Sequence, residues 1–312
     1  MLKHGIAIGD TQIENNIFLA PMAGYTDYCI RKLQIENGAG LTFTELVSAK
    51  GLMYGGNGSN ELLYSRGDEQ KTAVQLFGAD PYFLRSACES QYLAPFKIVD
   101  INMGCPVPKV FKNGEGSALL LDIKKAEEIV KECVKSGKNI TVKIRTGIKS
   151  GDNVATEFSK MAENSGAKLI TIHGRVRDAY YSGEPDFSAI EKAKNAVKIP
   201  VIANGGIFTK MDANDMINKT GADGVMLARG AIADPFLVSK LTGKISKYTL
   251  KSYILEHILL MKKRYPDYKA TVEFRKFTPY YFKGMTGVKE LKLKICQAKD
   301  TLELIDLIEK GL

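Results

Sequence analysis

The sequence predicts an α/β fold, a (β/α)8 TIM barrel followed by a small C-terminal all-α helical domain. Eight short apolar runs, rich in β-branched residues, recur through residues 1–230, and most stretches between them have the apolar spacing of one helix. From residue 240 onward the pattern is purely helical. A doubly wound sheet is the alternative, but no GxGxxG sequence opens a helix.

Local sequence accounts for each element in chain order. Residues 6–8 and 11–13 flank a Gly9-Asp10 turn and predict a hairpin that plugs the closed end of the barrel. The eight strands are predicted at residues 17–20, 41–46, 73–77, 98–102, 140–145, 168–173, 200–204 and 223–229. Residues 123–136 illustrate the helices, because their apolar residues share one face and Asp122 can cap the first turn.

The C-terminal segment is predicted to hold four helices, at residues 248–265, 269–283, 289–298 and 301–310. Pro266, Gly284 and Gly287 mark the breaks between them. We place the domain boundary at Thr242-Gly243, which gives a catalytic domain of residues 1–241 and a helical domain of residues 242–312.

Composition excludes several classes of protein. Among 312 residues, 45% are hydrophobic and 25% are charged, which is typical of globular chains and excludes disordered or fibrous ones. No apolar run approaches the length of about 18 residues that a membrane helix needs, and the N-terminus lacks the apolar core of a signal peptide. Five scattered cysteines without a CxxC pair argue against disulfides or a zinc site, so we expect a cytoplasmic protein without a metal.

The net charge of +9 is unevenly distributed. Residues 241–312 contain 15 basic and 8 acidic residues, whereas residues 1–240 contain 29 and 27. A nearly neutral body with a basic tail indicates a catalytic unit joined to a part that binds polyanions, although a lysine-rich solvated helical face is an equally good reading of charge alone.

Side chains alternate between the lumen and the helix layer along barrel strands, and chemistry occurs at the carboxyl ends of the strands. This alternation predicts that five polar side chains point into the lumen at the same end of the barrel, its mouth: Gln75, Lys143, Arg145, His173 and Asn204. Buried cations need an anion or strong acceptors, so the set indicates a site for a planar, hydrogen-bonding, anionic ligand.

Two glycine-containing loops follow the last two strands, where such barrels often bind phosphate. Gly205 and Gly206 follow Asn204, and Ala228-Arg229-Gly230 follows the eighth strand. Glycines let backbone N–H groups approach a phosphate, and Arg229 adds charge, although glycines alone could simply make turns.

Cys105 differs from the other four cysteines, which we interpret as small buried hydrophobes. It follows the fourth strand, beside the predicted ligand, on a loop that Pro106 and Pro108 stiffen. The position indicates a chemical role for its thiol.

Six motifs together resemble the tRNA-dihydrouridine synthases, in particular the bacterial B-type branch. They are APMAGYTD from residue 20, NMGCPVPK from 102, GSALL from 116, VKIRTG from 142, IHGR from 172 and NGGI from 204. The resemblance runs in order from residue 6 to about residue 285, and the combination is far more specific than one short motif.

The resemblance implies an FMN-containing barrel and a helical tRNA-binding domain, in a protein that we expect to be monomeric. The implied flavin-binding residues are Pro21, Met22, Ala23, Gln75, Lys143 and His173, with Asn204, Gly205, Gly206, Ala228 and Arg229 at the phosphate end. Asn102, Arg145 and Tyr181 would hold the uracil, and Cys105 would be the catalytic proton donor. Arg275, Lys276 and Lys283, interleaved with aromatic residues, are the candidate tRNA contacts.

The implied reaction reduces the C5–C6 double bond of a uridine in tRNA. NADPH reduces FMN, hydride passes from flavin N5 to uracil C6, and Cys105 protonates C5. An ordinary cysteine pKa of about 8.5 keeps the thiol protonated at neutral pH, as an acid requires. The stacked base must be flipped out to reach a barrel mouth, and Tyr180 and Tyr181 are candidates to contact it.

Two positions depart from the family pattern: Ala228 stands where a glycine is usual, and Phe277 stands where a histidine is usual. Two other functions compete with this reading. A flavin barrel that reduces a free pyrimidine would not need the basic tail. An RNA-binding protein that has lost its chemistry would have lost Cys105, Lys143 or His173, and all three are present.

Overall fold

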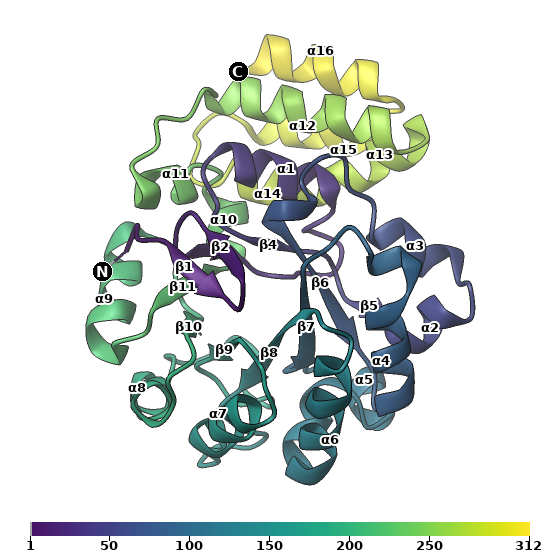
Figure 1. The fold of residues 1–312 in the computed structure, drawn as a ribbon. Coiled ribbons are helices and arrows are strands. Elements are labelled where there is room, and N and C mark those ends of the chain that lie inside the picture. Colours follow the sequence, from purple (N-terminus) through teal and green to yellow (C-terminus); the bar gives the residue numbers. More distant parts are fainter. Residues whose placement is uncertain (1) are drawn as a thin grey trace.

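The computed structural model describes residues 2–312 and confirms the barrel (Figure 1). Its parallel strands are β3 (Ile17–Leu19), β4 (Thr42–Phe43), β5 (Val47–Ser48), β6 (Thr72–Phe77), β7 (Ile98–Met103), β8 (Asn139–Arg145), β9 (Leu169–His173), β10 (Val201–Asn204) and β11 (Gly224–Leu227). The hydrogen-bonded order is β3-β11-β10-β9-β8-β7-β6-β4. A parallel bridge between Phe18 and Leu41 connects the two ends of this order, so the barrel is nearly closed.

The strand predicted at residues 41–46 is two short strands, which corrects the sequence prediction. β4 and β5 both pair with β6, through Thr42 opposite Thr72 and Val47 opposite Leu76. Between them the Thr44 hydroxyl accepts the backbone N–H of Gln75 at 3.0 Å. Because a side chain takes this N–H, the backbone ladder is interrupted there.

Helices surround the strands, as the alternating pattern predicts (Figure 1). Those of the barrel are α1 (Tyr28–Glu36), α2 (Ala49–Met53), α3 (Asn57–Leu62), α4 (Pro81–Glu89), α5 (Pro108–Lys112), α6 (Ile123–Val134), α7 (Ala155–Asn164), α8 (Phe187–Ala196), α9 (Lys210–Thr220), α10 (Arg229–Ala233) and α11 (Leu237–Thr242). Asp122 accepts the N–H of Lys125, which confirms it as the N-cap of α6.

Buried side chains form two apolar layers with the period of two that strands impose. Val74, Val142 and Ile170 face outward into the large cluster beneath the helices. Ala73, Ile98, Leu169, Ile202 and Met226 face inward, in a second cluster that fills the lumen. The interior is therefore packed, and only the ends of the strands are left for a ligand.

The predicted hairpin is present as β1 (Ile6–Ile8) and β2 (Thr11–Ile13). Its isoleucines join the lumen cluster. Asn139, the first residue of β8, donates hydrogen bonds to Asp10 at 2.6 Å and to Thr11 at 3.0 Å. The hairpin therefore closes the amino-terminal end of the barrel, and the site must lie at the opposite end.

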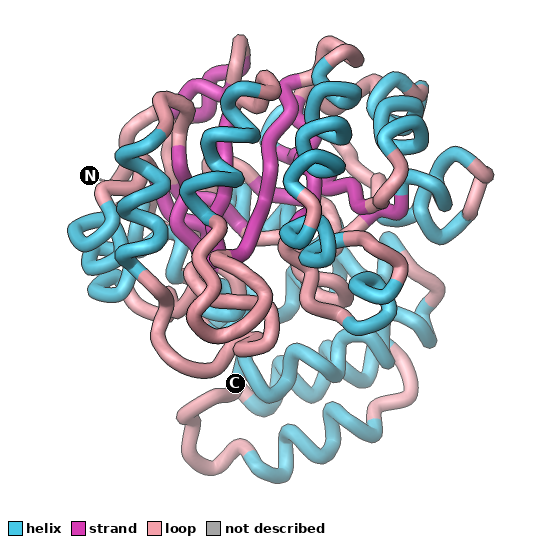
Figure 2. Tube along the Cα trace, turned by 90° about the horizontal axis from the view of Figure 1, so that it is seen from below, coloured by secondary structure: helices cyan, strands magenta, loops and turns pink. Residues whose placement is uncertain are grey.

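The C-terminal region is helical and lies beside the barrel as a separate layer (Figure 2). It comprises α12 (Leu250–Arg264), α13 (Asp267–Phe274), α14 (Thr278–Tyr281), α15 (Lys289–Gln297) and α16 (Thr301–Gly311). The single helix predicted at residues 269–283 is instead α13, a 3-10 turn at Arg275–Phe277, and α14. Pro279 has no backbone N–H to donate, so it fits the first turn of a new helix better than the interior of a long one.

Polar contacts join the C-terminal helices to α1. The Gln34 amide donates to the Tyr253 hydroxyl at 3.0 Å, and the Tyr265 hydroxyl donates to Asp27 at 2.9 Å. α11 ends at Thr242, and Gly243 follows with a left-handed φ of 70°. The division of function at residue 242 stays a prediction.

Candidate active site

The five polar side chains predicted at the barrel mouth come from neighbouring strands whose registers place them side by side. Gln75 is opposite Asp100, Arg145 is opposite His173, and His173 is opposite Asn204. Lys143 donates from its Nζ to Asn204 Oδ1 at 3.3 Å, and Asn204 in turn donates to the carbonyl of Met226 at 2.7 Å. The mouth is therefore continuous from β6 to β11.

Positive charge is concentrated at this mouth. Burial, with Arg145 nearby, lowers the pKa of Lys143, and the carboxylate of Asp100 opposes that shift. Burial and the surrounding cations hold the pKa of His173 well below its usual range, so its ring is neutral at pH 7. Nε2 of His173 lies 3.4 Å from Nη1 of Arg175. Such a set of crowded cations favours an anionic ligand.

The glycine loop after β10 is built for close backbone approach. Gly205 and Gly206 have φ values of 122° and 70°. A Cβ on Gly205 would lie 2.9 Å from Cδ2 of His173, so a larger residue would fill the space between loop and ring. Within residues 2–312, the backbone N–H groups of these two glycines have no acceptor. Free N–H groups beside buried cations fit a phosphate-bearing cofactor.

Cys105 lies at the edge of this mouth, with 9% of its surface exposed. Its backbone N–H donates to Asn102 Oδ1 at 2.8 Å, and its carbonyl accepts from the Ser117 hydroxyl at 2.7 Å. Gly116, with a φ of 60°, packs so closely that an added Cβ would lie 2.9 Å from Cys105 Cβ. Burial raises the pKa of the Cys105 thiol. The thiol is therefore held rigidly and remains protonated at neutral pH.

Arg145 is buried and connects two loops. Its Nε donates to the carbonyl of Gly104 at 3.0 Å, and its Nη1 donates to the carbonyls of Val176 and Tyr180 at 3.0 and 2.9 Å. It thus ties the cysteine loop to the loop after β9. The sequence pattern indicates Arg145 as a site residue but does not indicate this tie.

Tyr181 extends from the loop after β9 into a cluster of cations. Its ring lies 4.3 Å from the guanidinium carbon of Arg229 and 5.9 Å from that of Arg145, and its centroid is 6.4 Å from that of His173. The side chain is 52% exposed. It is therefore placed over the mouth, where a ligand ring could lie beside it.

The loop after β3 carries Pro21, Met22 and Ala23 along the same edge. Met22 packs against both apolar clusters, and its backbone N–H donates to the Thr26 hydroxyl at 2.7 Å. Pro21 and Met22 are partly exposed and Ala23 is exposed, so this segment can line a ligand.

Two functional candidates escaped sequence reasoning. Asp100 is fully buried in β7 and accepts hydrogen bonds from Gln75 and Thr141, both at 2.6 Å. Asp100 is two residues before Asn102 in the same strand, so the alternation of side chains already predicts that it points into the lumen. Arg175 follows His173 by two residues and donates twice to the carbonyl of Gly183, at 3.0 and 2.8 Å.

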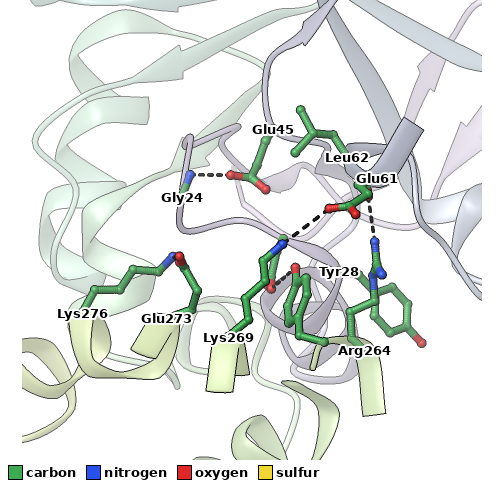
Figure 3. Close-up of a pocket in the computed structure, with 11 residues that line it drawn as sticks. Gly24, Tyr28, Glu45, Glu61, Leu62, Arg264, Lys269, Glu273 and Lys276 are labelled. Carbon is green, nitrogen blue, oxygen red and sulfur yellow. Dashed lines mark hydrogen bonds and ion pairs between the residues drawn. The ribbon is translucent and has the colours of Figure 1, made fainter. Parts of the chain in front are cut away.

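The candidate tRNA contacts differ in their surroundings. Arg275 donates to the carbonyl of Ala298 at 2.8 Å, so it also supports the helical region. Lys276 pairs with Glu273 and lies 5.7 Å from the ring centre of Tyr25, beside the loop after β3 (Figure 3). Lys283 is exposed. Phe277 is buried, with its ring 4.6 Å from that of His257, so it packs the C-terminal helices against one another.

A cavity of about 150 Å³ separates the C-terminal helices from the barrel next to Lys276 (Figure 3). Its wall mixes acids and bases: Asp27, Glu45, Glu61 and Glu273 with Arg264, Lys269 and Lys276. The cavity lies between the C-terminal helices and the loop after β3, of which Gly24 is part of the wall.

The part of the chain that the structure describes lacks two further features. No three His, Cys, Asp or Glu side chains among the described residues gather as metal ligands would. None of the described helices is both long and apolar enough to cross a membrane.

The family model and the similar sequences agree with one another. A family model described as dihydrouridine synthase matches residues 18–310. A probable tRNA-dihydrouridine synthase of Rickettsia conorii is 34% identical over 314 aligned positions, which cover 97% of this chain and 95% of the relative. A tRNA-dihydrouridine synthase B of Pasteurella multocida is 35% identical, over 89% of this chain and 87% of the relative.

Solved structures are similar in fold only. A histamine dehydrogenase from Rhizobium aligns with a TM-score of 0.57 at 15% identity, over 83% of this chain and 51% of the other. A 2-naphthoyl-CoA reductase aligns with a TM-score of 0.61 at 13% identity, over 78% and 52%. This chain thus spans about half the length of each. They support the barrel and carry no argument about its ligand.

Proposed function

The chain belongs to the dihydrouridine synthase family, and we propose that it reduces uridine in tRNA to 5,6-dihydrouridine with FMN as cofactor, NADPH as reductant and Cys105 as acid. One observation carries this proposal: Cys105, on a loop held by hydrogen bonds and with a raised thiol pKa, lies beside the cationic mouth of the barrel. Bound FMN would supply the hydride for uracil C6.

The residues of this chain have distinct parts in the proposal. Pro21, Met22, Ala23, Gln75, Lys143 and His173 would hold the flavin ring and ribityl chain. Asn204, Gly205, Gly206, Ala228 and Arg229 would hold its phosphate, since free N–H groups and a guanidinium suit that group. The positive charge of Lys143 would stabilise negative charge on a reduced cofactor.

Cys105 would give its thiol proton to C5 of the uracil. Its raised pKa supports this role, because an acid must hold its proton until the reaction needs it. Asn102, Arg145 and Tyr181 would hold the flipped base. The base would enter at the rim where Tyr181 is exposed.

We further propose that residues 1–241 carry the chemistry and that residues 242–312 bind tRNA through Arg275, Lys276 and Lys283. The surplus of basic residues in this region supports that division.

The test uses the purified full-length chain. We expect a yellow protein whose extracted cofactor is FMN, and which, with NADPH, raises the mass of one or more uridines in unmodified tRNA by two hydrogens. Mapping the dihydrouridine missing from tRNA of a deletion strain identifies the position. A colourless protein, an extracted FAD, or reduction of free pyrimidine in preference to tRNA would contradict the proposal.

A further inference from the structure

A chain of buried hydrogen bonds runs beneath the mouth from β8 to the cysteine loop. Thr141 and Gln75 donate to Asp100 Oδ1 and Oδ2, both at 2.6 Å. Asn102 Nδ2 donates to Gln75 Oε1 at 2.9 Å. Asn102 Oδ1 then accepts the backbone N–H groups of Cys105 and Gly104, at 2.8 and 3.2 Å.

The order of donors and acceptors in this chain is fixed at both ends, because the backbone N–H groups of Cys105 and Gly104 can only donate and an ionised Asp100 can only accept. Gln75 and Asn102 could each be turned over, since an amide has a donor side and an acceptor side of nearly equal shape. The ionised carboxyl of Asp100 can only accept, so it requires the NH2 side of Gln75. Gln75 then presents its oxygen to Asn102, and Asn102 presents its own oxygen to the cysteine loop.

Asp100 stays ionised at pH 7, because its pKa rises only to about 6. Burial raises the pKa of Asp100, but the hydrogen bonds from Gln75 and Thr141 and the charge of Lys143 oppose that shift. The side chains of Asp100, Gln75 and Thr141 have no exposed surface, so water cannot substitute for any of these partners.

We propose that Asp100 is a positioning residue: its carboxylate, together with the backbone N–H groups that Asn102 accepts, holds the Gln75 and Asn102 amides in one orientation and so fastens the loop that carries Cys105. The inference rests on the proposed function only for the use of Cys105 as an acid. The geometry of the loop can be tested without catalysis.

The experiment compares three variants of the full-length protein. Asp100→Asn keeps the shape but can also donate to Gln75, so Gln75 and Asn102 can turn over together, and Asn102 then no longer accepts from the cysteine loop. The swap variant, Asp100→Asn with Gln75→Glu, places the carboxylate at position 75 in place of position 100. A carboxylate at position 75 can only accept, so Asn102 must still donate to it and keeps its own oxygen toward the backbone N–H of Cys105. Thr141→Val is the matched control, because it removes a donor to Asp100 and leaves the carboxylate in place.

The readout is the rate at which iodoacetamide labels Cys105, with the flavin content of each variant recorded. Peptide mass separates this label from that of Cys296, which is exposed and not buried as the sequence predicts. We expect Asp100→Asn to label faster by on the order of fivefold, the effect of removing about one net hydrogen bond to the loop. The swap variant and Thr141→Val should label near the wild-type rate. The swap should do so whatever its flavin content.

Three results would overturn the proposal: a wild-type rate in Asp100→Asn, a swap variant that labels as fast as Asp100→Asn or does not fold, or equal acceleration in Thr141→Val. The last result would mean that general loosening of the core, rather than amide orientation, controls the loop. If Asp100→Asn itself fails to fold, a folded swap variant with a wild-type rate still supports the proposal.

Discussion

At the scale of single residues, Cys105 combines little exposure with a loop that several neighbours hold in place. Replacing it with alanine removes the acid but none of the groups proposed to hold the flavin. We expect Cys105→Ala to retain FMN and to oxidise NADPH, while tRNA reduction falls by about 10²–10⁴-fold. Mass spectrometry of tRNA beside a flavin-reduction assay checks this. Near-normal dihydrouridine formation would refute the acid role.

Arg145 offers a second test at this scale, because its three backbone acceptors lie on two different loops. A lysine keeps the charge but cannot reach all three carbonyls. Arg145→Lys should therefore raise the KM for tRNA several-fold and leave flavin content unchanged, since the loop with Tyr180 and Tyr181 loses its anchor. Lys143→Ala is the contrasting variant and should lose flavin. Equal flavin loss in both would count against the separate roles.

At the scale of elements, the basic residues that follow α13 differ in what their side chains contact. Lys276 lies beside the loop after β3 and Lys283 is exposed, whereas Arg275 supports Ala298. We therefore expect the double variant Lys276→Ala with Lys283→Ala to weaken tRNA binding without loss of folding or of NADPH-driven flavin reduction. The log–log slope of affinity against salt should flatten by roughly 0.7–0.9 for each phosphate that the variant no longer neutralises.

A charge-matched control for that variant is Lys131→Ala with Lys135→Ala, at the end of the outer helix α6, where both lysines pair with glutamates of the same helix. It removes the same charge far from the C-terminal helices (Figure 1). If both double variants lower tRNA affinity alike, net charge rather than the position of Lys276 and Lys283 explains the binding.

A buried histidine between α12 and α14 should make the stability of the fold depend on pH. His257 of α12 is fully buried, with its Nδ1 2.8 Å from the Tyr281 hydroxyl, and burial lowers its pKa to about 4. The unfolded chain takes up a proton near pH 6.5, but the folded protein resists until about pH 4. The stability linked to His257 is thus fully present above pH 6.5 and is lost as the pH falls toward 4.

The expected loss over that range is about 3 kcal/mol of unfolding free energy. In urea denaturation, His257→Phe should flatten the dependence of the unfolding free energy on pH between 6.5 and 4. Any pH dependence that is left comes from other groups such as His173. The exposed His4→Gln is the control and should behave as wild type. A His257→Phe curve parallel to wild type would contradict the assignment.

At the scale of the whole molecule, the barrel and the C-terminal helices meet along one cavity (Figure 3). Asp27 and Glu45 from the barrel face Lys269 and Lys276 from the helices across it. These charges partly compensate one another in the free protein. A bound polyanion would compete with Glu61 for Lys269 and with Glu273 for Lys276, so salt should affect tRNA binding more strongly than flavin binding.

The amino-acid sequence by itself determined the barrel, its plug, and which side chains point into the mouth. Strand alternation is a local property, so Gln75, Lys143, Arg145, His173 and Asn204 could be assigned to one side from parity alone. Motif order was enough to identify the family. The same parity applied to Asp100, but a lone buried carboxyl in an apolar strand does not reveal its partners.

Only the tertiary structure decided which of these groups touch. The bonds from Gln75 to Asp100 and from Arg145 to the loops of Gly104 and Tyr180 join residues 25 to 41 positions apart. The interruption between β4 and β5 depends on a bond from Gln75 to Thr44, and the break at Arg275–Phe277 is accompanied by packing of Phe277 on His257. Periodicity reports which face of an element is buried. What covers that face depends on elements distant in the chain, and those contacts exist only once the chain has folded.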